Sequence, residues 1–172
     1  MPLQTQLRLA LDTNVLFDRA ANHDFAITIL EFLHTHEIAL IVTYTVLAEL
    51  GSAVSRPISA QKAELAKRAL DCFRTWGIQT EVIEGSNLGI AAEVSNALRR
   101  EQLLPYDEFH DGCILAEAAL AKAQYLVTSD HHLISMDREK TKRVLKAQAL
   151  SDVHVVSPRS LYIRLKKNPR LA

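Results

Sequence analysis

Short apolar runs alternate with longer amphipathic segments along this chain, and that alternation limits the possible folds more than any other feature. The apolar runs occupy residues 7–12, 39–43, 80–83, 125–128 and 153–156. Between them, apolar residues recur every three or four positions, as they do in helices that cover a sheet. The sequence therefore predicts a three-layer α/β/α sandwich with a central, mostly parallel sheet.

The helices are predicted from this periodicity and from residues that begin or end helices. We expect them at residues 24–34, 44–54, 59–76, 87–101, 108–122, 138–150 and from residue 158 onward. Ser59 and Asp107 are suitable N-caps, and Gly77 is suited to ending a helix. No repeat, low-complexity tract or linker interrupts the pattern, so residues 1–172 are expected to form a single domain with a basic C-terminal helix and tail.

The composition is that of an ordinary globular domain. Hydrophobic residues make up 48% of the 172 positions, and a chain of this length can bury roughly two-thirds of its unfolded surface. Cys72 and Cys113 are far apart and lie in helical contexts, which indicates neither a disulfide framework nor a zinc site. No segment has the pattern of a signal peptide or a membrane span, so we expect a cytoplasmic protein without membrane contact.

Acidic residues lie at the ends of two predicted strands. Asp12 follows the run that ends at Leu11, and Asp130 lies just beyond the run that ends at Thr128. Parallel strands end at the edge where open α/β sheets bind ligands, so both carboxylates are expected there. Glu49 lies on a predicted helix after the second strand.

Three of these carboxylates also have a purely structural explanation. Asp12 suits an N-cap for a helix that begins at Thr13, and Glu49 lies at the margin of an apolar helix face. Asp130 can cap a turn, with the Thr128 and Ser129 hydroxyls donating to it.

Asp111 is harder to explain structurally. Apolar residues three, four, seven and eight positions later place it on the buried stripe of its helix. A buried carboxylate needs a hydrogen-bond donor or a metal. Taken together, four acids at one sheet edge indicate an all-oxygen site, and such sites favour Mg²⁺ or Mn²⁺ over zinc.

Four segments carry a resemblance to a known family. They are LALDTNVLF at 9–17, VLAEL at 46–50, HDGCILAEA at 110–118 and YLVTSDHHL at 125–133. In this order they resemble the PIN-domain family of metal-dependent ribonucleases, which includes the toxins of VapBC-type toxin–antitoxin pairs. The resemblance spans roughly Leu7 to Val156.

The resemblance implies a role for each matching residue. It makes Asp12, Glu49, Asp111 and Asp130 the catalytic metal ligands, for Mg²⁺ or Mn²⁺. It makes Asn14 and Ser129 supporting polar groups of the same site. It also implies endonucleolytic hydrolysis of RNA that leaves a 5′-phosphate and a 3′-hydroxyl.

The match departs from the family at one place. Many relatives read T-G-D-x-D after the last of these strands, whereas Ser129 and His132 stand here for the glycine and the second acid. That departure leaves open whether the site holds one metal ion or two.

The charge is uneven along the chain although the net charge is zero. From Arg138 onward, ten Lys and Arg face two acids, a formal charge of +8, and the preceding residues carry −8. A basic segment beside an acidic site can hold phosphates. The predicted nucleic-acid contacts are Arg138, Lys142, Arg143, Arg164, Lys166 and Lys167. Aromatic residues are only 6% of the chain, so no aromatic-rich base-reading surface is expected.

Partners follow from the same reasoning. An RNA substrate is expected, and the resemblance implies an antitoxin protein. The apolar helices at residues 24–34 and 44–76 offer surface for homodimerisation or for an antitoxin's amphipathic segment. Simple packing of these helices on the sheet is the alternative.

Other classes of protein fit less well. A haloacid dehalogenase-type phosphatase needs an acid where Asn14 stands, and a receiver-like phosphoacceptor needs a lysine where Asp130 stands. His110, His131 and His132 adjoin the acids, but a histidine-based hydrolase lacks a nucleophile motif here. A non-catalytic PIN-fold module that binds RNA or protein is the main alternative to the ribonuclease.

Overall fold

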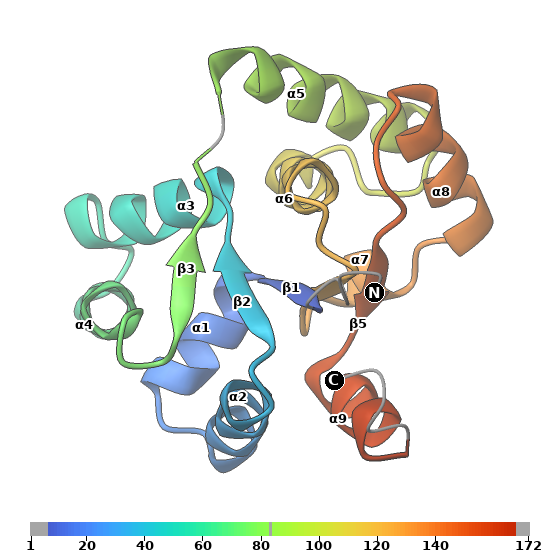
Figure 1. Ribbon diagram of the computed structural model, residues 1–172. Coiled ribbons are helices and arrows are strands. Elements are labelled where there is room, and N and C mark those ends of the chain that lie inside the picture. The colour runs from blue at the N-terminus through green and yellow to red at the C-terminus, as the bar shows by residue number, and fades with distance from the viewer. Residues whose placement is uncertain (1–6, 83, 168–172) are drawn as a thin grey trace.

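Five parallel strands form the central sheet of the computed structural model, which describes residues 7–82 and 84–167 (Figure 1). The strand order across the sheet is β3-β2-β1-β4-β5. The strands are β1 (Arg8–Leu11), β2 (Ala39–Val42), β3 (Ile78–Thr80), β4 (Tyr125–Val127) and β5 (His154–Val156). The predicted parallel sheet is confirmed.

The central strands are apolar because helices cover both of their faces. Leu9 of β1 pairs with Leu40 of β2 on one side and with Tyr125 of β4 on the other. Leu9, Leu40 and Leu126 are all at most 1% exposed. A continuous apolar run, rather than an alternating one, is the expected pattern for a strand buried on both faces.

Helices form the two outer layers. Helices α3, α5 and α6 lie over one face of the sheet, and α1, α2 and α9 lie over the other (Figure 1). Helix α4 packs against α1 and α3, and α8 packs against α5. The bounds are α1 (Thr13–Ala20), α2 (Asp24–Thr35), α3 (Tyr44–Ser55), α4 (Ala60–Cys72), α5 (Gly85–Arg100), α6 (Phe109–Leu120), α7 (His131–Ile134), α8 (Arg138–Ala147) and α9 (Pro158–Lys167).

Most predicted elements are found within a few residues of their expected places, with two additions. Helix α1 begins directly after Asp12, and α7 is a single turn after Asp130. Both helices are short, and both are capped by the strand-end aspartate that precedes them. Each of these aspartates therefore caps a helix while lying at the edge of the sheet.

Strand β3 lies earlier than predicted. It was expected at residues 80–83 but occupies Ile78–Thr80, and residue 83 lies outside the described residues. Ile78 is 6% exposed and pairs with Leu40, whereas Val82 is 89% exposed. The strand therefore begins directly after Gly77, at the first side chain that the sheet can bury.

Of the two N-caps predicted from the sequence, Ser59 is confirmed and Asp107 is not. The Ser59 hydroxyl accepts a hydrogen bond from the Lys62 N–H at 3.1 Å, as an N-cap does. The N-cap of α6 is Glu108 rather than Asp107, and its side chain makes no capping bond.

Within the described residues, both cysteines are free, and no helix has the length and apolar character that crossing a membrane requires. Residues 168–172, the end of the predicted basic tail, lie outside the described residues.

The chain changes direction across the sheet at β1. From β1 it proceeds outward through β2 to β3, then returns to add β4 and β5 on the other side of β1. A crevice opens at the C-terminal ends of strands where the order reverses in this way. This switch point lies between β1 and β4, and Asp12 and Asp130 follow those two strands.

Candidate active site

Asp12 lies at the switch point with its carboxylate almost fully buried. The Asp12 N–H donates to the Val127 carbonyl of β4 at 3.0 Å, which holds the residue at the edge of the sheet. One carboxylate oxygen accepts from the Thr13 N–H at 2.7 Å, and the other accepts from the Thr128 hydroxyl at 2.6 Å. Burial raises the pKa of the Asp12 carboxyl to about 6, although these hydrogen bonds oppose the shift.

Asn14 links Asp12 to the end of β4. Its side-chain amide donates to Asp12 Oδ2 at 2.8 Å and to Thr128 Oγ1 at 3.1 Å. Its carbonyl oxygen accepts from the Ser129 N–H at 3.0 Å. The two residues predicted to support the site therefore contact each other, Ser129 through its backbone N–H. An aspartate at position 14 would repel Asp12 and could not donate to it.

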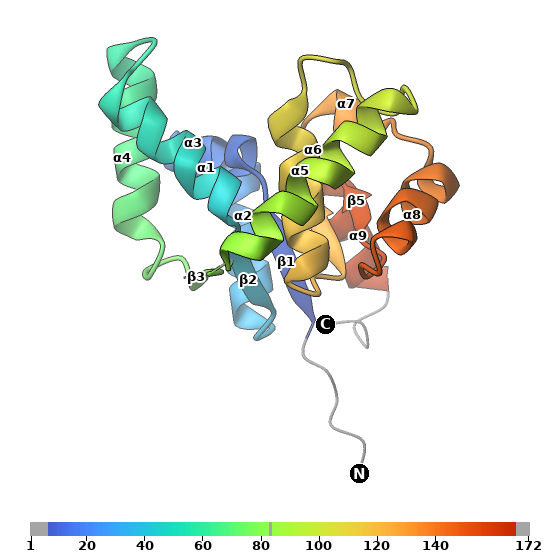
Figure 2. The ribbon, with the colours of Figure 1, turned by 90° about the horizontal axis from the view of Figure 1, so that it is seen from above.

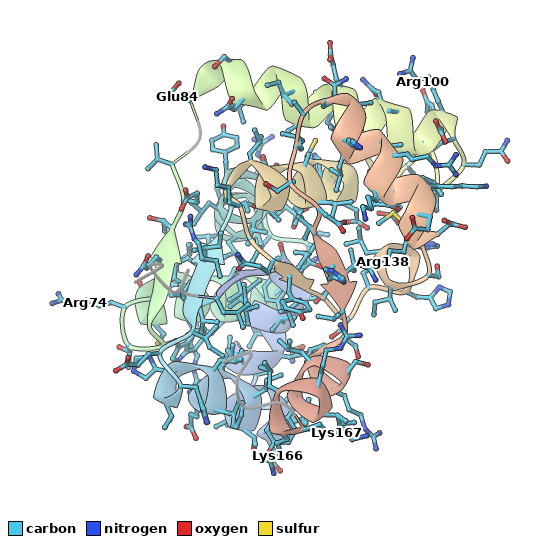
Figure 3. The ribbon with its side chains drawn as sticks, turned by 45° about the vertical axis from the view of Figure 1, so that its right-hand side comes forward. Arg74, Glu84, Arg100, Arg138, Lys166 and Lys167 are labelled. Carbon is cyan, nitrogen blue, oxygen red and sulfur yellow. The ribbon has the colours of Figure 1, made fainter. Side chains whose placement is uncertain are left out.

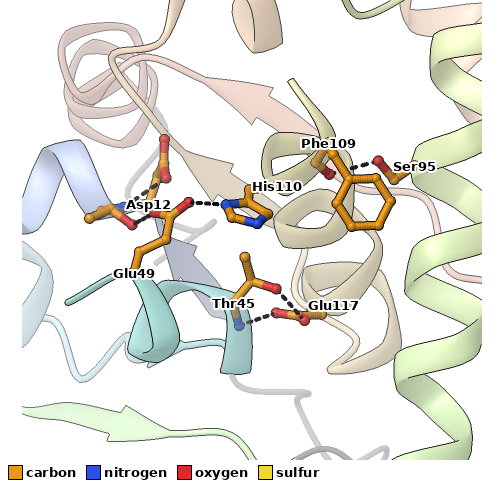
Figure 4. A network of polar contacts seen from close by, with 8 residues as sticks. Asp12, Thr45, Glu49, Ser95, Phe109, His110 and Glu117 are labelled. Carbon is orange, nitrogen blue, oxygen red and sulfur yellow. Dashed lines mark hydrogen bonds and ion pairs between the residues drawn. The ribbon is translucent and has the colours of Figure 1, made fainter. Parts of the chain in front are cut away.

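Glu49 reaches the same edge from α3. The Thr13 hydroxyl donates to one Glu49 carboxylate oxygen, and His110 Nδ1 lies 3.4 Å from the other (Figure 4). Thr13 and His110 belong to α1 and α6. Glu49 thus joins helices from both outer layers of the domain.

Asp111 lies in the first turn of α6 and carries the most perturbed carboxyl of the site. Burial, together with the charges of Asp12, Asp130, Glu108 and Glu49, raises the pKa of Asp111 to about 8. Its Oδ2 atom is buried without a hydrogen-bond partner among the described residues. A buried carboxylate oxygen without a donor is costly, and a bound cation relieves that cost.

Asp130 caps α7 with its side chain. Its Oδ1 accepts from the N–H groups of His132 at 2.6 Å and Leu133 at 3.3 Å. The expectation that the Thr128 hydroxyl donates to Asp130 was wrong, because that hydroxyl donates to Asp12 and accepts from the Asp130 N–H at 2.9 Å. Thr128 therefore fixes both strand-end aspartates at once.

The four carboxylates are electrostatic neighbours but not a preformed metal shell. Asp111 is influenced by each of the other three acids. In the described part of the chain, no three His, Cys, Asp or Glu side chains are already arranged as ligands of one metal ion. The donors nevertheless suit a hard divalent cation, since all are oxygens and one buried oxygen lacks a partner.

Sequence reasoning missed a buried contact that holds α3 in place. Glu117 of α6 is only 1% exposed. Its two carboxylate oxygens accept from the Thr45 N–H at 2.9 Å and the Thr45 hydroxyl at 2.7 Å (Figure 4). Thr43, the N-cap of α3, makes no side-chain capping bond. Glu117 therefore caps, from another helix, the helix that carries Glu49, and a charged residue in the apolar stretch of α6 was the one available signal.

A second missed contact fixes the start of α6. The hydroxyl of the fully buried Ser95 donates to the Phe109 carbonyl at 2.7 Å. A Cβ atom at Gly112 would lie 2.4 Å from Ser95 Oγ and 2.7 Å from Ser95 Cα. Helices α5 and α6 cross closely here, as their adjacent ribbons indicate (Figure 2). This close crossing fixes the position of the first turn of α6, which carries Asp111 next to Gly112.

A groove of about 790 Å³ adjoins the acidic edge. Apolar residues line most of it, from α1, α3, α5 and α6, and Thr13, Glu49, His110 and Glu117 contribute polar atoms. Arg56 and Lys62 also line it, and Ile58 beside them is 87% exposed. The groove therefore joins an apolar surface to part of the acidic site.

The six predicted phosphate-binding cations do not form one strip. Arg138 and Lys142 of α8 lie 3.7 and 3.9 Å from the carboxylate of Asp152. Lys166 and Lys167 end α9, apart from Arg138 (Figure 3). Helix α9 follows the C-terminal end of β5, and Tyr162 in its middle meets Phe32, near the end of α2 that leads into β2. The last residues of α9 therefore lie away from the acidic edge. Arg143 and Arg164 are exposed on α8 and α9.

Comparison with known proteins identifies the fold. No protein-family model and no curated protein matches the sequence. A chain in the crystal structure of VapBC2 from Rickettsia felis, bound to a DNA fragment from their promoter, matches with a TM-score of 0.60 and 22% identity, over 88% of this chain and 98% of that chain. A chain in the structure of FitAB bound to the IR36 DNA fragment matches with a TM-score of 0.52 and 18% identity, over 87% and 94% of the two chains.

The fold is PIN-like. At these identities the similarity establishes the fold, and the three-layer sandwich predicted from the sequence is confirmed. The PIN-like sheet order differs from the 2-1-3-4-5 order of flavodoxin-like receivers. In this PIN-like chain, Asn14 occupies the place of a phosphatase's second acid and donates to Asp12.

Proposed function

We propose that this protein is a metal-dependent endoribonuclease that hydrolyses RNA phosphodiester bonds, as the toxin of a toxin–antitoxin pair. One observation carries the proposal: a buried carboxylate oxygen of Asp111, without a hydrogen-bond partner in the described part of the chain, lies among three other acids at the switch point of a PIN-like sheet. A helix-capping carboxylate accepts from backbone N–H groups, as those of Asp12 and Asp130 do, and this oxygen accepts from none among the described residues. A cation-binding carboxylate keeps such an oxygen free, because the cation is its partner.

The chain's residues divide the work of such a site. Asp12 and Asp111 would hold Mg²⁺ or Mn²⁺ most directly, and Glu49 and Asp130 would hold it through water. When bound, such a cation orients and acidifies a water and neutralises charge on the scissile phosphate. Asn14 and Thr128 keep Asp12 in one rotamer, and Thr13 does the same for Glu49. A carboxylate of this edge then accepts the proton of the attacking water.

An antitoxin is the proposed protein partner. The neighbours VapBC2 and FitAB are complexes captured on DNA fragments, and the apolar groove beside Glu49 has the size and lining to take an amphipathic helix. A basic side chain on that helix would meet Glu49 on the groove's polar wall. Occupation of the groove would therefore block the acidic edge as well.

Product analysis tests the reaction. Purified protein with Mn²⁺ and an end-labelled single-stranded RNA should give internal cuts with a 5′-phosphate and a 3′-hydroxyl. Products with a 2′,3′-cyclic phosphate would contradict metal-dependent hydrolysis, because they arise from attack by the RNA's own 2′-hydroxyl.

A groove variant tests the partner. Ala53 on α3 lines the groove, so Ala53→Arg should prevent binding of the proposed antitoxin, sought as the product of an adjacent gene, while RNA cleavage persists. Ala147→Arg, at the end of α8 and outside the groove, is the matched control. Equal binding by both variants would contradict docking in the groove.

A further inference from the structure

The connection between α5 and α6 presents one tyrosine almost entirely to solvent. Tyr106 is 86% exposed although it lies only five residues before Asp111. Beneath it, the Arg99 guanidinium lies 4.9 Å from the Tyr106 ring centre and 5.0 Å from the Phe109 ring centre. Two aromatic rings and one guanidinium therefore form a single stack beside the start of α6.

The arginine of this stack is fixed by hydrogen bonds. One terminal nitrogen of Arg99 donates to the Tyr106 carbonyl at 2.6 Å, and the other donates to Asn96 Oδ1 at 2.5 Å. These two hydrogen bonds hold the guanidinium against the Tyr106 ring. Its effect is to brace Tyr106 from one side, while the exposure of Tyr106 leaves the other side of the ring open.

The surroundings favour a nucleobase over a protein surface as the occupant of that open side. Glu101, Gln102 and Asp107 on the same connection are all exposed and polar, so Tyr106 does not belong to an apolar patch of the kind that protein partners cover. An exposed aromatic ring with arginines beside it, here Arg99 and Arg100, is instead a usual element of single-stranded nucleic acid binding.

The position of Tyr106 connects it with the acidic edge. An open hollow of about 470 Å³ is lined by Arg99, Pro105, Tyr106 and His132, among others. The His132 N–H donates to the Asp130 carboxylate at 2.6 Å. The hollow therefore leads from the tyrosine to the residues that flank Asp130. Arg100, exposed at the end of α5 (Figure 3), lines a second hollow with Arg99 and Tyr106.

We propose that Tyr106, braced by Arg99, is a stacking platform for an unpaired base of an RNA strand whose phosphodiester lies at the acidic edge. The inference rests on the proposed ribonuclease function and adds to it a residue that contacts the RNA. A stacked base must leave its own helix, so the site selects single-stranded RNA over duplex. Stacking accepts any base, so the platform adds affinity without a strict sequence requirement.

Three substitutions at one position test the platform. Binding of a fluorescein-labelled single-stranded RNA is measured by anisotropy in EDTA, which prevents metal-dependent cleavage. Tyr106→Phe keeps the ring and should bind like wild type, whereas Tyr106→Ala should bind about tenfold more weakly. Tyr106→Leu keeps an apolar side chain without a ring and should resemble Tyr106→Ala. All three should melt at the wild-type temperature, because the side chain is exposed.

An RNA with abasic sugars is the matched ligand control. Its affinity should be lower than that of the intact RNA for wild type and equal for wild type and Tyr106→Ala. If Tyr106→Leu binds like wild type, the contact is not stacking and the inference is overturned. The same holds if Tyr106→Ala binds intact RNA like wild type, an outcome that leaves exposed Tyr106 to a protein partner.

Cleavage measured in parallel separates the two proposals. Wild-type cleavage with Mn²⁺, together with full RNA affinity in Tyr106→Ala, overturns the platform alone. A wild type that binds RNA through Tyr106 but does not cleave it overturns the ribonuclease and keeps the platform. A wild type that neither binds nor cleaves single-stranded RNA overturns both.

Discussion

Neutralising Asp111 should stabilise the metal-free protein at alkaline pH. In the folded state, burial and neighbouring acids raise the pKa of Asp111 from 3.8 to about 8. A carboxyl whose folded pKa is raised favours folding fully below its unfolded pKa, and that contribution is lost as pH rises through the folded pKa. The free energy of unfolding should therefore fall between about pH 4 and pH 8, and Asp111→Asn should remove that part of the fall.

The size of the effect follows from the shift and from the exposure of the side chain. The stability of wild type falls as the pH rises from 5 to the folded pKa of about 8, a range of roughly three pH units. For a fully buried group this range would correspond to about 4 kcal/mol. Asp111 is partly exposed, so solvent screening reduces this to about 2 kcal/mol. From pH 5 to pH 9 without metal, Asp111→Asn should gain about that amount of stability relative to wild type.

Urea unfolding in EDTA at pH 5, 7 and 9 measures this difference. Asp107→Asn is the matched control, because Asp107 is exposed four residues earlier and should leave the pH dependence unchanged. A difference between Asp111→Asn and wild type that stays constant from pH 5 to pH 9 would refute the reasoning. So would a mutant that is less stable at pH 9, since that is the behaviour of an ordinary packing or capping residue.

Three further outcomes follow from the same contacts. Gly112→Ala should cost about 1 to 3 kcal/mol in thermal unfolding, because the new Cβ meets the Ser95 backbone; an unchanged melting temperature would show that α5 and α6 can separate freely. Glu117→Ala should cost about 2 to 3 kcal/mol and lower kcat more than Glu117→Gln, because Thr45 loses both hydrogen bonds and α3 carries Glu49; equal kcat in the two variants would exclude this positioning role. RNA affinity should fall as salt rises, and Arg138→Glu should weaken binding more than Lys167→Glu, which lies away from the acidic edge; the opposite ranking would place the RNA over α9.

The sequence predicted the parts of the fold that depend on long, regular patterns. The apolar runs ending at Leu11 and Thr128 predicted the adjacent strands β1 and β4, and parallel pairing then placed Asp12 and Asp130 at one edge. Helix α3 was expected at residues 44–54 and occupies Tyr44–Ser55, since its apolar residues recur with helical spacing. The homodimer and the cytoplasmic location remain predictions.

Other features could not be read from local patterns because they depend on residues far apart in the chain. The Glu117–Thr45 contact joins positions 72 residues apart, and the Thr128–Asp12 contact joins positions 116 apart. Helix α7 has only four residues and forms because Asp130 caps it. The basic residues are neighbours in sequence, but α8 and α9 carry them to different parts of the surface.

Part of the apolar surface that was predicted to bind partners packs against another helix of the same domain. Phe25 and Phe32 of α2 meet the Tyr162 ring of α9 edge-on, at 5.9 and 5.2 Å between ring centres. This part of α2 is therefore packed within the domain, as the simpler alternative held. The groove beside α3, by contrast, is an apolar surface that adjoins the acidic residues and is open to a partner.

The central claim is that the four acids form a metal-dependent hydrolytic site, and one cleavage assay tests it most directly. Wild type and Asp111→Asn are incubated with the same single-stranded RNA in EDTA, and then with excess Mn²⁺. Wild type should cleave only after Mn²⁺ is added, and folded Asp111→Asn should be slower by orders of magnitude, because a charged cation ligand is lost. Cleavage that persists in EDTA and in Asp111→Asn would contradict the account.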